Sequence, residues 1–444
     1  MSSLIDRMKA LPARAVAMPK NIKLFLFSVL VYGMAVEGIS AVLLNLYLLR
    51  LGYGTEFIGT LNSAGLFVFA LVSLPIGAVQ NISSRKMLMI GLVFSMVGLI
   101  GLPLAQYADS WQAALLIGFR IMSMIGLSCY FVHQVPFAME ITKPVWHSRI
   151  LSLTMATFSL AAFFGSWVGG LLPEWFSVWL ALPLTDPRPF QLPMFVATAV
   201  VVPGLISVWM ISEAAADDSS EAEKAEANSA VLKSAESRSS SHSRFGNWRA
   251  IIGLVTLIIV IRALQTSSVG IVNTFSNVYF DDFLNVPTNR IGLISGIGRL
   301  LGVPLSLTIP WLVGRYGNFR LVLISLGLIA VLLIPMAFIP SWQIAAVALI
   351  AINSMGSLRY LSFISFTMSL VTEKQRSLIS GAGEMAIGVG FAASSFVGGY
   401  LISWYGYREL FLFGAAVTTI GTLAFWLIFR NRAATIPTDP VPAG

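Results

Sequence analysis

The chain has 444 residues, of which 57% are hydrophobic and only 11% are charged. A soluble domain carries about 25% charged residues, so this chain cannot solvate itself as a globule and needs lipid around it. A single cysteine, Cys129, excludes an intrachain disulfide and a cysteine-rich metal site, and three histidines argue against a metal enzyme. The net charge of +8 would suit nucleic acid, but the positions of the charges favour a membrane topology instead.

Apolar runs long enough to cross a membrane, which takes roughly 20 residues, occur twelve times along the chain. The first six spans are expected near 24–48, 57–80, 87–107, 112–137, 150–172 and 190–211. The other six are expected near 250–276, 290–313, 320–339, 343–370, 378–402 and 409–429. The predicted fold class is therefore an all-α membrane protein with twelve transmembrane helices. The first apolar run is too long for a signal peptide.

The segment between the sixth and seventh spans, 213–248, is rich in Ser, Ala and Glu and almost free of large apolar residues. Such a segment cannot bury enough surface to fold alone, so we expect a flexible cytoplasmic linker. A regulatory role for the serine-rich run 237–241 is the alternative. The predicted units are an N-terminal segment (1–23), a six-helix bundle (24–212), the linker (213–248), a second six-helix bundle (249–429) and a tail (430–444).

The positions of lysine and arginine indicate the orientation. With both termini and the linker in the cytoplasm, the cytoplasmic segments hold twenty of the 28 basic residues and the outer loops hold four. Cytoplasmic loops of membrane proteins carry such an excess. We therefore expect a multi-pass protein of the plasma (cell inner) membrane with both termini cytoplasmic, and the basic pI needs no nucleic acid.

One glycine pattern occurs twice, 229 positions apart: SWVGG at 166–170 and SFVGG at 395–399. The register holds without a gap over 148–169 and 377–398. A hydrophobic chain built from two related halves is typical of a transporter whose halves enclose a midplane site. The glycines expected to let helices approach closely are Gly165, Gly169, Gly170, Gly398 and Gly399. Static packing is the alternative to a sliding or bending contact.

The loop after the second span, GAVQNISSRK at 77–86, resembles the loop motif of the major facilitator superfamily, Gly-x-Leu-Ala-Asp-Arg-x-Gly-Arg-Lys. Gly77, Arg85 and Lys86 match this motif, and Asn81 replaces its aspartate. The mirrored loop after the eighth span keeps Arg315 and Gly317. Both loops are expected to make tight cytoplasmic turns whose cations interact with neighbouring helix ends and acidic lipid.

Two further segments resemble motifs of proton-linked drug antiporters in that superfamily. Span four carries Arg120 with a glycine six residues later, Gly126. Span five keeps Gly165, Gly169 and Gly170 of the antiporter signature but has Ser166 in place of its proline. The resemblance implies the fold of the superfamily, with two pseudo-symmetric six-helix bundles, and favours antiport.

Ionisable residues inside a membrane are costly and therefore point to function. In the facilitator fold, spans one, four, seven and ten line a central cavity. The resemblance therefore implicates six residues of those spans in the substrate or proton pathway: Glu37, Arg120, Arg262, Arg359, Asn273 and Tyr360.

Glu37 is the carboxylate expected near mid-membrane, and it could exchange protons as its surroundings alternate. A fixed Glu–Arg pair that holds helices together is the alternative. Arg299 and Glu384 are expected to be structural partners or gate residues rather than ligands.

The leading hypothesis is a secondary transporter that exports a small amphipathic solute in exchange for protons. Alternatives are an uptake symporter or uniporter for a small organic anion or another solute, and a non-transporting receptor or scaffold with the same fold. The sequence lacks a nucleophile–base pair, a metal-ligand cluster and a phosphate-binding motif, so we expect no enzyme activity, no cofactor and no metal. The expected partners are the solute, the lipid bilayer and protons, without nucleic acid, and the expected state is a monomer.

Overall fold

The computed structural model describes residues 19–78, 82–142, 146–211, 248–369 and 373–433. Within these ranges the secondary structure is helical and contains no strand. Eleven helical segments are long and apolar enough to cross a membrane, and α11 (Thr288–Tyr316) completes a set of twelve. Nearly all of the predicted linker, including the serine run, lies outside the described residues.

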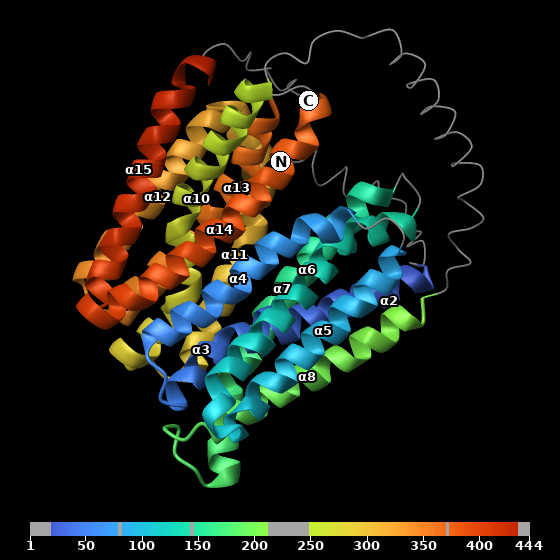
Figure 1. The fold of residues 1–444 in the computed structure, drawn as a ribbon, viewed down its shortest axis with the longest axis vertical. Coiled ribbons are helices and arrows are strands. Elements are labelled where there is room, and N and C mark those ends of the chain that lie inside the picture. Colours follow the sequence, from blue (N-terminus) through green and yellow to red (C-terminus); the bar gives the residue numbers. More distant parts are fainter. Residues whose placement is uncertain (1–18, 79–81, 143–145, 212–247, 370–372, 434–444) are drawn as a thin grey trace, which may run out of the picture.

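The first bundle contains six spans and is coloured blue to green in Figure 1. Its first span is a continuous helix of 31 residues, made of α2 (Lys20–Tyr32), a π-helical segment (Gly33–Ser40) and α3 (Ala41–Arg50). The other five are α4 (Thr55–Ala78), α5 (Ser84–Leu104), α6 (Gln112–Glu140), α7 (His147–Leu180) and α8 (Arg188–Trp209).

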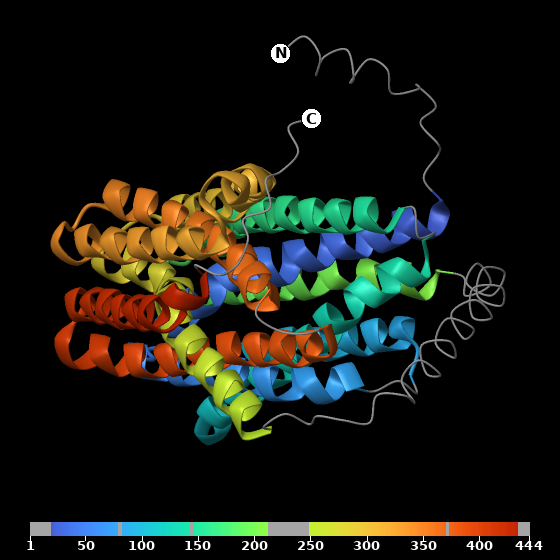
Figure 2. The same cartoon turned by 90° about the horizontal axis from the view of Figure 1, so that it is seen from above.

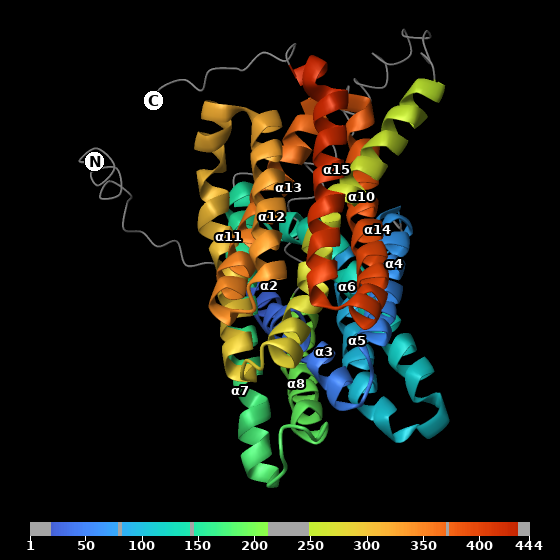
Figure 3. The same cartoon turned by 90° about the vertical axis from the view of Figure 1, so that its left-hand side faces the viewer.

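The second bundle lies beside the first and is coloured yellow to red (Figures 1 and 3). It begins with α10 (Trp248–Val278), which ends in a π-helical turn (Tyr279–Phe283), and α11. It continues with α12 (Asn318–Phe338), α13 (Trp342–Ser369), α14 (Glu373–Tyr405) and α15 (Tyr407–Ala433). The axes of the helices in both bundles are roughly aligned with one another (Figure 2). We call the face where α2 begins and α15 ends the terminus side, and the other face the opposite side.

Tryptophans mark the two ends of the helices. Trp209 and Trp311 lie at the terminus side, and Trp175, Trp179 and Trp404 lie at the opposite side, with exposed fractions of 64–71%. Indole rings are enriched at the two membrane–water interfaces because one end is apolar and the other carries an N–H group. The two groups of tryptophans therefore indicate where the two membrane surfaces meet the protein.

Helix α7 is longer than the span predicted at 150–172. It continues through Pro173 to Leu180 and ends where Ala181 adopts a left-handed conformation, with φ of 52°. At the start of this extension Asn289 of α11 donates a hydrogen bond of 3.0 Å to Glu174, whereas Trp175, Val178 and Trp179 further along are 66–83% exposed.

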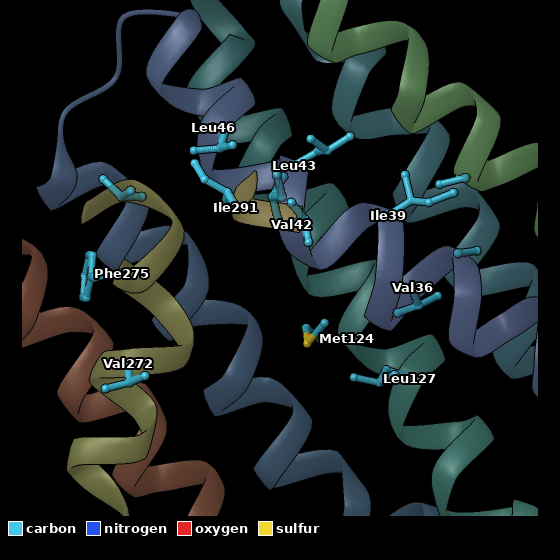
Figure 4. Packing of buried hydrophobic residues seen from close by; sticks show 14 of the residues in the cluster. Val36, Ile39, Val42, Leu43, Leu46, Met124, Leu127, Val272, Phe275 and Ile291 are labelled. Carbon is cyan, nitrogen blue, oxygen red and sulfur yellow. The ribbon is translucent and has the colours of Figure 1, made fainter. Parts of the chain in front are cut away.

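The hydrophobic core is continuous across the two bundles. The bundles meet where α4 packs along α14 and α7 packs along α11. Between these two contacts, one apolar cluster joins Val42 and Leu43 of α3, Val272 and Phe275 of α10, and Ile291 of α11 (Figure 4). The opposite-side halves of the first and seventh spans are therefore packed against each other.

The second glycine of each repeated pair makes a close contact between the bundles. A Cβ on Gly170 of α7 would lie 2.9 Å from the Cα of Gly292 of α11. In the copy, a Cβ on Gly399 of α14 would lie 3.1 Å from the Cα of Gly59 and 2.5 Å from the carbonyl oxygen of Thr55, both in α4. Any larger residue would push the helices apart at these two points.

The other glycines of the pattern pack within their own bundles. A Cβ on Gly169 would lie 2.9 Å from the Cα of Ile39 in the first span, and a Cβ on Gly398 would lie 2.7 Å from a ring carbon of Phe275 in the seventh. Gly165 faces the backbone of Met34. The two halves thus use equivalent glycines for equivalent contacts.

Candidate functional site

A cavity of about 450 Å³ lies between the two bundles. The first span, α4, α6 and α7 form one wall, and α10, α11, α13 and α14 form the other. Three charged residues line it: Glu37, Arg120 and Arg299. Most of its other polar lining consists of amides and hydroxyls, from Ser40, Asn45, Asn62, Asn273, Asn277, Ser295 and Asn353.

Glu37 and Arg299 join the two bundles inside this cavity. Glu37 belongs to the π-helical segment of the first span, and Nη1 of Arg299 in α11 donates to its Oε2 at 2.5 Å. The two side chains remain 28% and 31% exposed, so the pair is reached from the cavity. π-helical turns often occur at functional sites, and here the turn lies where Gly38 packs closely against Gly165 of α7.

Arg120 of α6 supplies the third charge. Its Nη2 donates to Oδ1 of Asn62 at 3.0 Å, and its buried Nε has no hydrogen-bond partner. Glu37 is the carboxylate whose charge acts on Arg120, but Glu37 is already paired with Arg299. The described lining residues therefore leave the cavity with one net positive charge.

Two asparagines hold the bundles together in a reciprocal way. Nδ2 of Asn45 in the first span donates to the carbonyl oxygen of Thr274 in α10 at 2.7 Å. Nδ2 of Asn277 in α10 donates to the carbonyl oxygens of Ala41 and Val42, at 3.2 and 3.3 Å. Each asparagine thus bonds to the backbone of the helix that carries the other.

Each of these asparagines is oriented by the next helix of its own bundle. Nδ2 of Asn62 in α4 donates to Oδ1 of Asn45 at 2.9 Å, and the hydroxyl of Ser295 in α11 donates to Oδ1 of Asn277 at 2.9 Å. Because Asn62 also accepts from Arg120, a chain of hydrogen bonds runs from the cavity to the contact between the bundles.

Further contacts toward the opposite side close the cavity in that direction. Arg50 makes a bidentate pair with Asp281, with both N–O distances at 2.8 Å. This geometry gives the strongest kind of charge-assisted contact. The hydroxyl of Thr55 donates to the carbonyl oxygen of Gly399 at 3.1 Å. Together with the close glycine contacts, these bonds seal the first span and α4 against the second bundle.

The structure places three of the six predicted pathway residues, Glu37, Arg120 and Asn273, at the cavity. Arg262, Arg359 and Tyr360 are not among its lining residues. Arg262 lies eleven positions before Asn273 in the same helix, which is about 16 Å along the axis. Spans seven and ten therefore line the cavity as expected, but at positions nearer the opposite side. Arg299 and Glu384, which the sequence analysis expects to be structural partners or gate residues, lie beside Glu37 and Arg262, and Arg299 also lines the cavity.

The sequence analysis did not recognise the reciprocal asparagines. Asn45 and Asn277 lie 232 positions apart, and Gly59 and Gly292 lie 233 apart. These offsets are close to the 229 of the glycine repeat, so the repeat extends to the first, second, seventh and eighth spans. A search that allowed a gap of three or four residues relative to that offset would have paired the asparagines.

The first loop motif fastens helix ends at the terminus side. Nε of Arg85 donates to the carbonyl oxygen of Val208 at 3.2 Å, and its Nη2 donates to that of Trp209 at the end of α8. A cation at a helix C-terminus satisfies carbonyls that lack a partner in the helix. Gly77 lies in the last turn of α4, Lys86 is exposed, and Asn81 lies outside the described residues.

The mirrored loop makes the tight turn that the motif predicts. Gly317 has φ of 74°, a conformation that favours glycine, and it separates α11 from α12. Its N–H donates to the carbonyl oxygen of Val313 at 2.8 Å. The guanidinium of Arg315 stacks on Trp311 and Tyr316, at 5.9 and 5.7 Å from the ring centroids.

A cavity between two six-helix bundles, closed at one end by matched contacts, is the arrangement typical of a membrane transporter. The family model described as Major Facilitator Superfamily matches residues 25–382 and, in a second match, residues 320–443. The chain belongs to this superfamily.

Individual relatives are distant. The multidrug resistance protein MdtG of Proteus mirabilis (strain HI4320) is 22% identical over 374 residues, which cover 82% of this chain and 84% of MdtG. The crystal structure of the nucleoside transporter NupG matches with a TM-score of 0.69 at 14% identity, over 93% of this chain and 100% of that one. A bacterial homologue of the iron transporter ferroportin, solved in an inward-facing state, matches with a TM-score of 0.68 at 15% identity, over 92% and 98% of the two chains. The structural matches show the fold alone.

Proposed function

We propose that the protein is a proton-coupled secondary transporter that exports a small amphipathic solute by alternating access. The observation that carries this proposal is the Glu37–Arg299 pair, which joins the bundles and is reached from the cavity. A proton on Glu37 removes the charge that attracts Arg299, so protonation weakens a contact that must break when the bundles move. The similarity to a multidrug resistance protein supports export of an amphipathic solute.

The terminus side is the cytoplasmic face in this proposal, and the membrane is the plasma (cell inner) membrane. The excess of lysine and arginine in the terminal and loop segments of that side supports the orientation. Solute enters the cavity from the cytoplasm while the opposite side is closed. Rocking of the bundles then opens the opposite side, where protons enter.

The experiment uses purified protein in liposomes, with ethidium as the first of a panel of amphipathic dyes. Glu37→Gln keeps the shape of the side chain but cannot titrate, so pH-gradient-driven transport is expected to fall to the level of empty liposomes. Dye binding is expected to remain. Glu174→Gln is the matched control, because Glu174 accepts a hydrogen bond outside the cavity. Gradient-driven transport at the wild-type rate in Glu37→Gln would remove Glu37 from the mechanism.

A second candidate function is transport of a small organic anion. It is favoured by Arg120, whose charge has no carboxylate of its own and whose Nε lacks a hydrogen-bond partner. The planar fork of a guanidinium suits a carboxylate or phosphate group. An anion in the cavity would neutralise the one unbalanced charge of its lining.

A further inference from the structure

A second group of charged residues lies inside the second bundle, apart from the central cavity. It consists of Arg262 of α10, Arg359 and Tyr360 of α13, and Glu384 of α14. The arginines are almost completely buried, with exposed fractions of 2% and 4%, whereas the Glu384 side chain is 50% exposed. The cluster thus holds two buried cations and one half-exposed carboxylate, which lies beside Arg262.

The hydrogen-bonding capacity of these arginines is largely unused. Nη2 of Arg262 lies 3.8 Å from Oε1 of Glu384, which is too far for a hydrogen bond. Nε and Nη2 of Arg262, and Nε and Nη1 of Arg359, have no hydrogen-bond partner. The hydroxyl of Tyr360 donates to the same oxygen of Glu384 at 2.9 Å. Burial of an ionised group costs several kcal/mol unless hydrogen bonds compensate, so these donors need an acceptor.

One edge of the Arg262 guanidinium makes no hydrogen bond. Its guanidinium carbon lies 4.5 Å from the ring centroid of Phe363 and 5.5 Å from that of Tyr360, so aromatic rings cover its face. The unpartnered Nε and Nη2 form the edge that binds a carboxylate or phosphate with two parallel hydrogen bonds. The charge of Arg262 also repels that of Arg359, and an anion between them would relieve this repulsion.

The cluster lies in the terminus-side half of the second bundle. Its carboxylate, Glu384, belongs to α14, a helix that faces the first bundle. Glu384 precedes Gly388 by one helical turn, and so lies on the same face of α14. Gly388 packs against Ala70 of α4, where a Cβ would meet the Ala70 side chain at 2.5 Å. Since the Glu384 side chain is 50% exposed and the arginines are buried, we take Glu384 as the point at which a ligand reaches the cluster.

We propose that Arg262 and Arg359 form a binding site for one anionic group, a carboxylate or a phosphate, near the terminus side. Glu384 is the internal carboxylate that the group displaces from Arg262. With two arginines and Glu384, one singly charged ligand brings the cluster to neutrality. The group can belong to a small solute or to the headgroup of an anionic lipid, since both offer the same acceptor oxygens.

The test measures the thermal unfolding midpoint of the purified full-length protein in detergent as inorganic phosphate is added at constant ionic strength. We expect a saturable rise in the midpoint for the wild type. Arg359→Met should weaken the apparent affinity by about tenfold or more, since hydrogen bonds to a charged group are lost. Glu384→Gln should strengthen it roughly fivefold, because the internal competitor is gone. A gain in affinity cannot arise from a general loss of stability.

Two variants locate the effect. Arg430→Met removes an exposed arginine of α15 and should leave the phosphate response unchanged. Arg120→Met should leave it unchanged as well, because Arg120 lines the central cavity. Loss of the response in Arg120→Met, with its retention in Arg359→Met, would overturn the proposal in favour of the central cavity.

A second arm separates the two sources of the anionic group. The midpoint is compared in nanodiscs of phosphatidylglycerol and of phosphatidylcholine. Stabilisation by the anionic lipid alone, removed by Arg359→Met, upholds the site and identifies its ligand as a lipid headgroup. Absence of both the phosphate and the lipid response in the wild type overturns the proposal. Since transport is not measured, the outcome is independent of the role of Glu37.

Discussion

Arg120 is held on one edge only. Asn62 accepts from its Nη2, while its Nε has no partner, and the side chain faces the cavity. A guanidinium in this setting can serve as the anchor of an anionic ligand, or it can act through Asn62 to position the polar residues around it. A lysine at this position would distinguish the two roles. Lysine keeps the positive charge but lacks the planar fork that binds an anion with two hydrogen bonds.

Arg120→Lys therefore distinguishes the two candidate functions. For the amphipathic solute of the leading proposal, we expect its affinity to stay nearly unchanged while coupling or stability changes. For an organic anion, we expect a loss of about tenfold or more. The measurement is equilibrium binding of neutral, cationic and anionic solutes at matched protein levels, with Arg188→Lys as a surface control paired to Asp186. Selective loss of anion binding would contradict our leading proposal and support the second candidate.

At this scale the sequence identified which charges lie in the membrane but not how they pair. Glu37 finds Arg299 at a separation of 262 positions, in the other bundle. Arg262 and Arg359 were expected in the cavity because their helices line it. A helix that is apolar all round does not reveal which face or depth a polar residue occupies, so only the packed structure separates the two sites.

Between elements, the decisive contacts are the two places where glycine meets glycine across the bundles. Gly170 with Gly292 joins α7 to α11, and Gly399 with Gly59 joins α14 to α4. Small residues allow the helix backbones to approach within van der Waals distance. The two contacts stand at equivalent places in the two halves, so they stabilise the closed opposite side symmetrically.

Gly399→Ala tests this contact. The added methyl group would meet the carbonyl oxygen of Thr55 at 2.5 Å, and such overpacking costs about 1–3 kcal/mol. We expect a lower thermal unfolding midpoint and a looser opposite side. Gly327→Ala in α12 is the matched control, because its Cβ would meet nothing within 4 Å, and alanine is the better helix former by about 1 kcal/mol. Equal effects of the two changes would show that the close approach is unimportant.

The elements themselves were largely predictable from hydropathy. Twelve apolar runs became twelve spans, and the glycine repeat indicated two related bundles. The ends were less predictable, since helices α7 and α14 extend beyond the predicted spans, to Leu180 and from Glu373. Polar residues at a helix end cost little free energy, because the end lies in water or at the membrane interface. The sequence pattern alone therefore does not distinguish a helix end from a loop.

The whole molecule presents tryptophans at both ends of its helices, and its orientation between them is open to a direct test. Cys129 is the single cysteine and is buried, so Cys129→Ser provides a background for single-cysteine labelling. Ser110 lies in an exposed turn at the opposite side and Ser83 in an exposed position at the terminus side. An impermeant maleimide is expected to label Ser110→Cys in intact cells and Ser83→Cys only after permeabilisation. The reverse pattern would contradict cytoplasmic termini.

The side-chain amide of Asn62 makes hydrogen bonds to two partners. It can therefore couple ligand binding at Arg120 to closure of the opposite side, through one chain of hydrogen bonds. Its oxygen serves Arg120 and its nitrogen serves Asn45, which bonds to Thr274. If an acceptor group of a ligand competes with that oxygen for the Nη2–H of Arg120, then occupancy and closure have a free-energy coupling, which must be reciprocal. Asn45→Ala removes the hydrogen bond to Thr274 between the bundles, worth about 1 kcal/mol, together with the bond that Asn45 accepts from Asn62. We predict that loss of the bond between the bundles shifts closure and ligand affinity by the same factor, roughly fivefold. Spin-label distances across the opposite side, compared with ligand binding in the same variant, would reveal unequal factors if the two ends act independently.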